Sequence, residues 1–186
     1  MTNQDPLTHI PDPAEISPTS TAMRYGLIGA LVAIAVGLVF NLTDMISYTD
    51  QTAPGNMAQM VIGIAILVVC MVLAIKQHRD EELGGYIKLG RAFRTGFLTG
   101  LFLALASAVW VFIFFSFVSP EIVDIIRENA WDQAIEGGTT EEQLEQGKAF
   151  FDFFTSPLWM TIMSFIFNLI ITLVLAFITG AIMKKD

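Results

Sequence analysis

Four long apolar runs dominate the pattern of hydrophobic and polar positions along this chain. They cover about residues 25–43, 57–75, 97–118 and 158–183. A bilayer core needs roughly 20 apolar residues per helix, whereas a soluble helix would carry a polar face. The pattern therefore predicts an all-α integral membrane protein with four transmembrane helices, arranged as two hairpins.

The polar segments divide the chain into a tail, one membrane domain and its loops. Residues 1–22 are rich in Pro, Ser and Thr. Such a composition cannot bury enough apolar surface to offset the entropy of ordering, so we predict a disordered tail. Residues 23–186 form the membrane domain. Its two longest loops differ in charge, because 76–96 is basic and 119–156 is acidic.

The acidic loop 119–156 carries the signals of two helices. Ser119-Pro120-Glu121 is typical of a helix start, and Gly137-Gly138 of a helix end. A capping box then begins at either Thr139 or Thr140. We predict a helical, partly amphipathic hairpin that lies against the outer membrane surface or caps the bundle.

Small residues recur every four positions in three of the runs, which places them on one face of each helix. Such strips let transmembrane helices approach closely. We predict helix packing at Gly29, Ala33 and Gly37, at Gly96, Gly100 and Ala104, and at Ala176 and Gly180. Within one chain we expect the strip at Gly96 to pack on the strip at Gly29, with a homodimer seam as the alternative.

Residues 86–97 sort by face at helical spacing. Tyr86 and Phe93 fall on one side, and Lys88, Arg91 and Arg94 fall on another. We predict an amphipathic segment at the headgroup level, with these five residues as the candidate contact with lipid or a partner. The alternative is that the basic residues only set the topology.

Charge also predicts the orientation of the chain. Eight Lys and Arg residues lie before the first run, in loop 76–96 or at the C-terminus, and the two other loops hold only Arg127 and Lys148. Under the positive-inside rule, we expect both termini in the cytoplasm. The net charge of −8 argues against a nucleic-acid partner.

The chain lacks the residue patterns that reaction chemistry needs. It has two histidines, His9 and His78, and no nucleotide-binding or protease motif. We interpret His78 and its acidic neighbours as a charged, solvated helix end rather than a metal site. We therefore expect no enzymatic activity and no catalytic, cofactor-binding or metal-binding residues.

Asn168 is the candidate intramembrane polar site, because it lies near the middle of the fourth run. With Ser164, Thr161 and Thr99 it would line a polar path across the membrane. The alternative is that these side chains bond between helices or to their own backbone.

Several segments together resemble those of one family. They are HRDEELGGYIKLGRAFRTG after the second run, SPEIVDIIRENAW after the third, the acidic EEQLEQ helix, and SPLW at the start of the fourth. Over residues 21–185 the chain resembles the small four-span bacterial membrane proteins described as domain of unknown function 4199 (DUF4199). The resemblance implies the four-span topology and a bacterial inner-membrane location. With both termini in the cytoplasm by the positive-inside rule, we then expect loop 119–156 in the periplasm. It implies no activity and no site residue.

Two functions remain as expectations. The first is a non-enzymatic role in which the protein binds a partner as an accessory or scaffold subunit. The alternative is a small oligomeric channel or transporter with a polar path near Asn168. The expected partners are the lipid bilayer and either another membrane protein or further copies of this chain.

Overall fold

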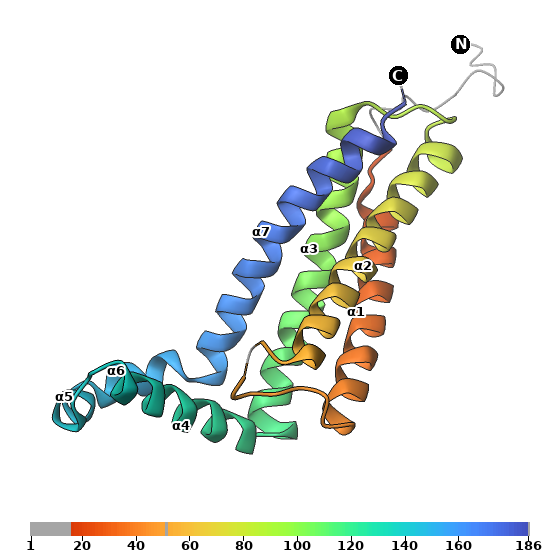
Figure 1. The fold of residues 1–186 in the computed structure, drawn as a ribbon. Helices are drawn as coiled ribbons and strands as arrows, with labels where there is room; N and C mark the ends of the chain where they lie inside the picture. Colours follow the sequence, from red (N-terminus) through yellow and green to blue (C-terminus); the bar gives the residue numbers. More distant parts are fainter. Residues whose placement is uncertain (1–15, 51, 186) are drawn as a thin grey trace, which may run out of the picture.

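The protein is a bundle of four long helices with a helical extension at one end (Figure 1). The computed structural model describes residues 16–50 and 52–185. The four long helices are α1 (Thr19–Leu42), α2 (Pro54–Gln77), α3 (Leu89–Ile113) and α7 (Pro157–Met183). Each has the length and hydropathy needed to cross a membrane. The predicted all-α fold with four transmembrane helices is therefore confirmed.

The outer surface of the bundle is apolar, as a lipid-facing surface must be. Only 17% to 28% of the most hydrophobic window of each long helix is buried inside the bundle. Leu31, Val109 and Ile182 are 68%, 61% and 75% exposed. Soluble monomers rarely expose contiguous apolar surface on this scale. The chain is a multi-pass membrane protein.

The first membrane helix begins earlier than predicted. α1 starts at Thr19, so the predicted disordered tail of residues 1–22 included its first turn. The remainder of that prediction falls mainly on residues 1–15, which lie outside the described residues.

The connection between the second and third spans is shorter than predicted. α2 continues as a π-helix, η1 (His78–Glu82), and α3 already starts at Leu89. Gly84 and Gly85 turn the chain between them with φ angles of 69° and 97°, which favour glycine. The predicted amphipathic segment is not a separate element, because residues 89–96 form the first turns of α3. At its other end α3 is extended by a second π-helix, η2 (Phe114–Val118).

α3 lies at the centre of the bundle and contacts α1, α2 and α7, most extensively α7. A Cβ added to Gly96 would lie 3.5 Å from the Ala176 Cβ, and one added to Gly180 would lie 3.0 Å from the Phe93 backbone nitrogen. The Gly96–Gly100 strip therefore packs on the Ala176–Gly180 strip of α7. The prediction that it packs on the first helix was wrong.

α1 approaches α3 through a glycine that lies outside the predicted strip. A Cβ added to Gly26 would lie 2.6 Å from the Thr99 backbone oxygen. Gly29, which was predicted, is wedged against Cys70 of α2 and Leu103 of α3, each 2.8 Å from an added Cβ. The spacing of small residues therefore identified part of the packing face of α1, but not the helix that packs against it.

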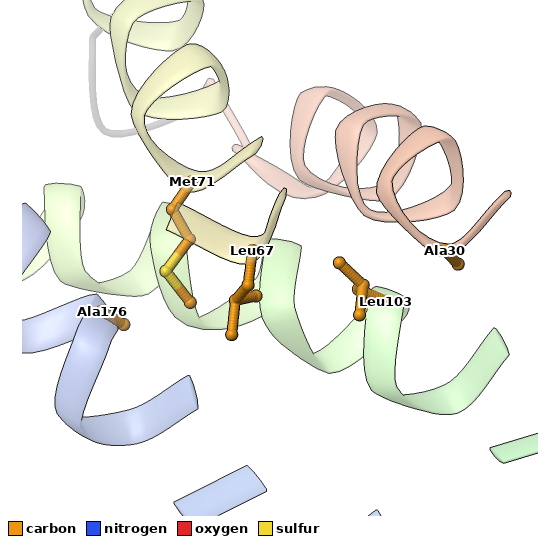
Figure 2. Packing of buried hydrophobic residues seen from close by; sticks show 5 residues of the cluster. All are labelled: Ala30, Leu67, Met71, Leu103 and Ala176. Atoms are coloured by element: carbon orange, nitrogen blue, oxygen red, sulfur yellow. The ribbon is translucent and has the colours of Figure 1, made fainter. Parts of the chain in front are cut away.

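Five buried side chains close the middle of the bundle (Figure 2). They come from all four long helices and are Ala30, Leu67, Met71, Leu103 and Ala176. We call them the core cluster. Each is at most 7% exposed, so these side chains fill the centre of the bundle at this level.

Residues 119–156 form the arm, which confirms the prediction that this loop is helical. It runs across the bundle axis past the end of α7 and projects to one side, rather than capping the bundle (Figure 1). Its helices are α4 (Glu121–Glu136), α5 (Glu141–Gln146) and α6 (Lys148–Phe154). Of the two capping boxes considered, the structure contains the one at Thr140. Ser119 does not cap α4, whose N-cap is Pro120.

Candidate functional site

A cavity of about 480 Å³ lies between the arm-side halves of α1, α2, α3 and α7. α7 diverges from α1 and α2 toward this end of the bundle (Figure 1). Most of the lining side chains are aliphatic or aromatic, and none of the described residues that line it is charged. This volume and composition are typical of a small-molecule site.

The apolar wall of the cavity also contains uncharged polar groups. They belong to Asn41, Tyr48, Asn56, Gln59, Ser107, Trp110 and Asn168. Asn41, Tyr48 and Asn56 lie at the arm-side end of the cavity, where α1 ends and α2 begins. Asn168 lies deeper, roughly 16 Å along α7 from Pro157 at the helical rise of about 1.5 Å per residue.

Hydrogen bonds hold the arm-side end of the cavity in place. Asn41 Nδ2 donates to the Tyr48 hydroxyl oxygen at 2.7 Å. The Asn56 side chain donates to the Ser47 backbone oxygen at 2.7 Å and accepts from the Ser47 backbone nitrogen at 3.0 Å. Burial raises the pKa of Tyr48, partly opposed by the Asn41 bond, so the phenol stays neutral at physiological pH.

The deep end of the cavity is closed by the core of the bundle. Leu67 and Leu103 line this end and also belong to the core cluster. Met71 and Ile75 follow on the side away from the arm, and both are 0% exposed. The cavity is therefore a pocket with one closed end.

Asn168, the candidate intramembrane polar site, lies in the wall of this cavity. Its Nδ2 donates to the Ser164 backbone oxygen at 2.8 Å. The hydroxyls of Thr161, Ser164 and Thr99 also donate to backbone oxygens of their own helices. The hydrogen bonds of these side chains are therefore local, as the alternative predicted. They do not link the hydroxyls and Asn168 into a polar path.

A comparison with known protein families matches nearly the whole chain. The model of the family described as Protein of unknown function (DUF4199) matches residues 24–185. The chain belongs to this family. No curated protein and no solved structure matches it.

At the end opposite the arm, the DUF4199 protein separates the five residues predicted to share a contact surface. Phe93 is half-buried and packs on the core cluster, and its own backbone lies against Gly180 of α7. Arg91 is half-buried, and its Nη2 donates to the Ile16 backbone oxygen at 3.2 Å. The three residues that remain exposed are Tyr86, Lys88 and Arg94. Their contact with lipid or a partner stays a prediction.

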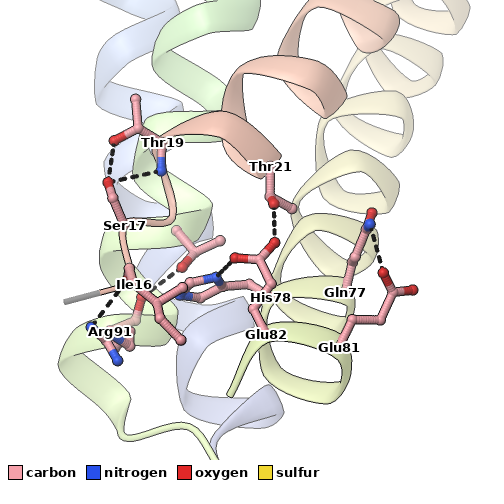
Figure 3. Close-up of polar contacts among 10 residues, drawn as sticks. Ile16, Ser17, Thr19, Thr21, Gln77, His78, Glu81, Glu82 and Arg91 are labelled. Carbon is pink, nitrogen blue, oxygen red and sulfur yellow. Dashed lines mark hydrogen bonds and ion pairs between the residues drawn. The ribbon is translucent and has the colours of Figure 1, made fainter. Parts of the chain in front are cut away.

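Beside this surface, the DUF4199 protein holds a buried polar cluster that the sequence reasoning missed (Figure 3). His78 is 0% exposed, and its Nδ1 lies 2.7 Å from Glu82 Oε2. The Thr21 hydroxyl donates to the other Glu82 oxygen. Within the described residues, His78 Nε2 has no hydrogen-bond partner. The expectation of a solvated helix end was therefore wrong for His78, although Asp80 and Glu81 are exposed as expected.

Helical spacing contained the signal for this burial. His78 follows the buried Met71, Ala74 and Ile75 at the i, i+3, i+4, i+7 positions of one helix face. The cavity residues Gln59, Ser107 and Trp110 were also missed. Gln59 is the one amide side chain in the otherwise apolar run 57–75, which was the available signal.

Proposed function

We propose that this DUF4199 protein is a non-enzymatic binding protein of the bacterial inner membrane. It holds an uncharged, membrane-embedded ligand in the cavity between α1, α2, α3 and α7. The observation that carries this proposal is the cavity itself, which combines an apolar wall with uncharged polar groups and has a closed deep end.

The cavity wall extends to the lipid-facing surface, which supports entry of a ligand from the bilayer. Met60 of α2 and Phe167 of α7 both line the cavity. They are also 52% and 60% exposed. A ligand that leaves the bilayer between these helices keeps its apolar body out of water throughout.

A binding role accounts for this geometry better than a conducting role. A path near Asn168 would have to continue past Leu67, Leu103 and Met71, which pack together in the core cluster. A channel or transporter would need the core cluster to open. The proposal therefore predicts no flux of ions or small solutes through the protein in proteoliposomes.

The proposed orientation places both termini and the turn 83–88 in the cytoplasm and the arm in the periplasm. Its support is the distribution of Lys and Arg along the chain. In this orientation the cavity occupies the periplasmic half of the bundle.

The proposal is tested by the access of lipid to Trp110, which lines the cavity. The chain has three tryptophans, so a Trp131→Phe/Trp159→Phe variant leaves Trp110 as the sole reporter. In bilayers with brominated acyl chains, we expect quenching of its fluorescence.

A cavity-filling variant shows whether the quenching comes from lipid inside the cavity. Gly63 lines the cavity, and nothing lies within 4 Å of an added Cβ. Gly63→Leu should therefore fill the space without a clash and protect Trp110. Gly90→Leu is the matched control, because Gly90 also has open space but lies outside the cavity. Equal quenching in both variants would contradict the proposal.

The arm favours a second function, which is contact with a basic protein partner as an accessory subunit. It holds nine acidic and two basic residues. Arg127 is already paired with Asp124 at 2.9 Å and with Asp152 at 3.5 Å. The exposed acids of α5 are therefore available to steer a positively charged partner.

This second function predicts crosslinks from the arm that depend on its charge. Neutralising α5 with Glu141→Gln, Glu142→Gln and Glu145→Gln should reduce crosslinking to the partner in intact cells. Glu81→Gln, which removes an exposed acid at the other end of the bundle, is the control. Crosslinks that are identical in both proteins would exclude an electrostatic role for α5.

A further inference from the structure

Within the described residues, three polar groups that line the cavity make no hydrogen bond, and their chemistry limits what the cavity could bind. They are the Gln59 carboxamide, the Ser107 hydroxyl and the Trp110 indole N–H. None of them makes a hydrogen bond to any part of the protein that the structure describes. The inference drawn from them rests on the binding function proposed above.

A polar group without a partner in a membrane interior is costly, because no water is there to replace the missing bond. The hydroxyls of Thr99 and Ser164 avoid this cost by donating to their own backbone at 2.9 Å and 3.0 Å. Ser107 does not. Its hydroxyl, like the other two groups, is left for whatever occupies the cavity.

Each of the three groups can donate a hydrogen bond, and the indole N–H can do nothing else. Ser107 and Trp110 are three residues apart on α3, so they lie on one face of that helix. Gln59 comes from α2 and reaches toward α1, where its Nε2 would lie 3.3 Å from a Cβ added to Gly37. A ligand that satisfies all three groups must present hydrogen-bond acceptors to two helices.

The ligand must also be uncharged. None of the described lining residues is acidic or basic, so a phosphate or carboxylate would be desolvated without a counter-charge. The aromatic rings of Trp110 and Phe114, with centroids 6.1 Å apart, give the wall a rigid apolar surface. Phe114 begins η2, and short π-helical segments occur frequently at functional sites.

We propose that the cavity binds an uncharged amphiphile whose head presents carbonyl oxygens to Gln59, Ser107 and Trp110. The apolar body of the ligand lies along the aliphatic and aromatic wall. Two kinds of membrane component carry this chemistry. One is a lipophilic quinone with ring carbonyls, and the other is a diacylglycerol with ester carbonyls.

Thermal unfolding of the full-length protein in dodecyl maltoside, a detergent without carbonyl groups, tests this proposal. The probes are a benzoquinone with a decyl tail and dioctanoylglycerol. Decylbenzene is the control, because it has the same apolar body as the quinone and no carbonyl. We expect a saturable rise in unfolding temperature with at least one probe and none with decylbenzene. The probe that stabilises the protein identifies the head group.

Two pairs of variants locate the effect. Gly63→Leu should abolish stabilisation by filling the cavity, and Gly90→Leu should leave it unchanged. Gln59→Leu should weaken the apparent affinity about fivefold, as expected for the loss of one net hydrogen bond. Gln77→Leu is its control, because Gln77 lies at the other end of α2 and bonds to Glu81.

The outcomes separate this proposal from the broader one. If Gly63→Leu protects Trp110 from brominated lipid but neither probe stabilises the protein, the cavity binds lipid and the carbonyl assignment is wrong. If decylbenzene stabilises the protein as well as the carbonyl probes do, the assignment is also wrong. If Trp110 is not protected and no probe acts, both proposals fail.

Discussion

The close contact between α3 and α7 depends on glycines that have no side chain. At Gly100 an added Cβ would collide with the Thr172 side chain and would lie 3.0 Å from Met71 Cε. Without a hydrophobic driving force between helices in lipid, such close approach is what stabilises their association. A larger side chain at this position must push α7 away.

Gly100→Leu is therefore expected to destabilise the bundle by about 2–3 kcal/mol, the cost of overpacking a close contact. The free energy of unfolding can be measured by titration with sodium dodecyl sulfate, followed by circular dichroism. Gly90→Leu, at a position with open space, should change this free energy little. A loss at Gly100 no larger than that at Gly90 would mean that the strip does not hold the helices together.

His78 and Glu82 of η1 form a buried pair that Thr21 links to the start of α1. His78→Ala would leave a void and remove one partner of the Glu82 carboxylate. We expect a loss of about 2–3 kcal/mol in the free energy of unfolding. Lys76→Ala, two residues away and exposed, is the control for the same titration. If the two variants lose equally little, the buried cluster is not a structural tie.

At the scale of elements, local pattern determined the helices but not their neighbours. Apolar length predicted α1, α2, α3 and α7, because a membrane helix satisfies its backbone within itself. Three helices carry small-residue strips of the same spacing. This spacing shows which face of a helix packs, but not which other helix it packs against. The pairing of Gly96–Gly100 with α7 rather than α1 therefore could not be derived from the sequence.

The candidate site shows the same limit. Asn168 could be singled out because a polar residue in an apolar run is conspicuous. The cavity beside it depends on the divergence of α7 from α1 and α2 (Figure 1), which is a tertiary property. Ser107 and Trp110 are ordinary residues for a packed helix, and only their place in the cavity wall gives them significance.

The arm is an element held together by a few contacts of its own. Arg127 of α4 pairs with Asp152 of α6 and donates to Thr155 at 3.3 Å. Trp131 and Phe151 pack edge to face at 5.3 Å. Because the charged groups are partly exposed, their contribution to stability is expected to be below about 1 kcal/mol.

Arg127→Ala should therefore loosen the arm without unfolding the bundle. We expect faster hydrogen–deuterium exchange in residues 141–154 and unchanged exchange in α3 and α7. Lys148→Ala, which removes the other basic residue of the arm, should leave the exchange of α6 nearly unchanged. Faster exchange throughout α7 after Arg127→Ala would show that the arm and the bundle open together.

At the scale of the whole molecule, the two ends of the bundle differ in charge and in structure. Ile87 and Lys185 form an antiparallel bridge, and Glu82 bonds to Thr21, so the C-terminus, the turn 83–88 and the start of α1 lie together. The arm lies at the opposite end (Figure 1). The arrangement supports the proposal that one end faces the cytoplasm and the other the periplasm.

Cysteine labelling tests this orientation. Lys88→Cys and Glu142→Cys place thiols at exposed positions on opposite ends. With a membrane-impermeant maleimide on intact cells made permeable only at the outer membrane, we expect Glu142→Cys to react and Lys88→Cys to stay unlabelled. The native Cys70 is buried and should give no background. Labelling of Lys88→Cys alone would reverse the proposed topology.

Native mass spectrometry of the full-length protein most directly tests the central claim that the cavity holds a lipophilic ligand. Released gently from membranes, the wild-type protein and Gly90→Leu should each retain a bound molecule of defined mass. Gly63→Leu, in which the cavity is filled, should lose it. If all three proteins appear without a bound molecule, or all three retain the same one, the cavity is not the binding site.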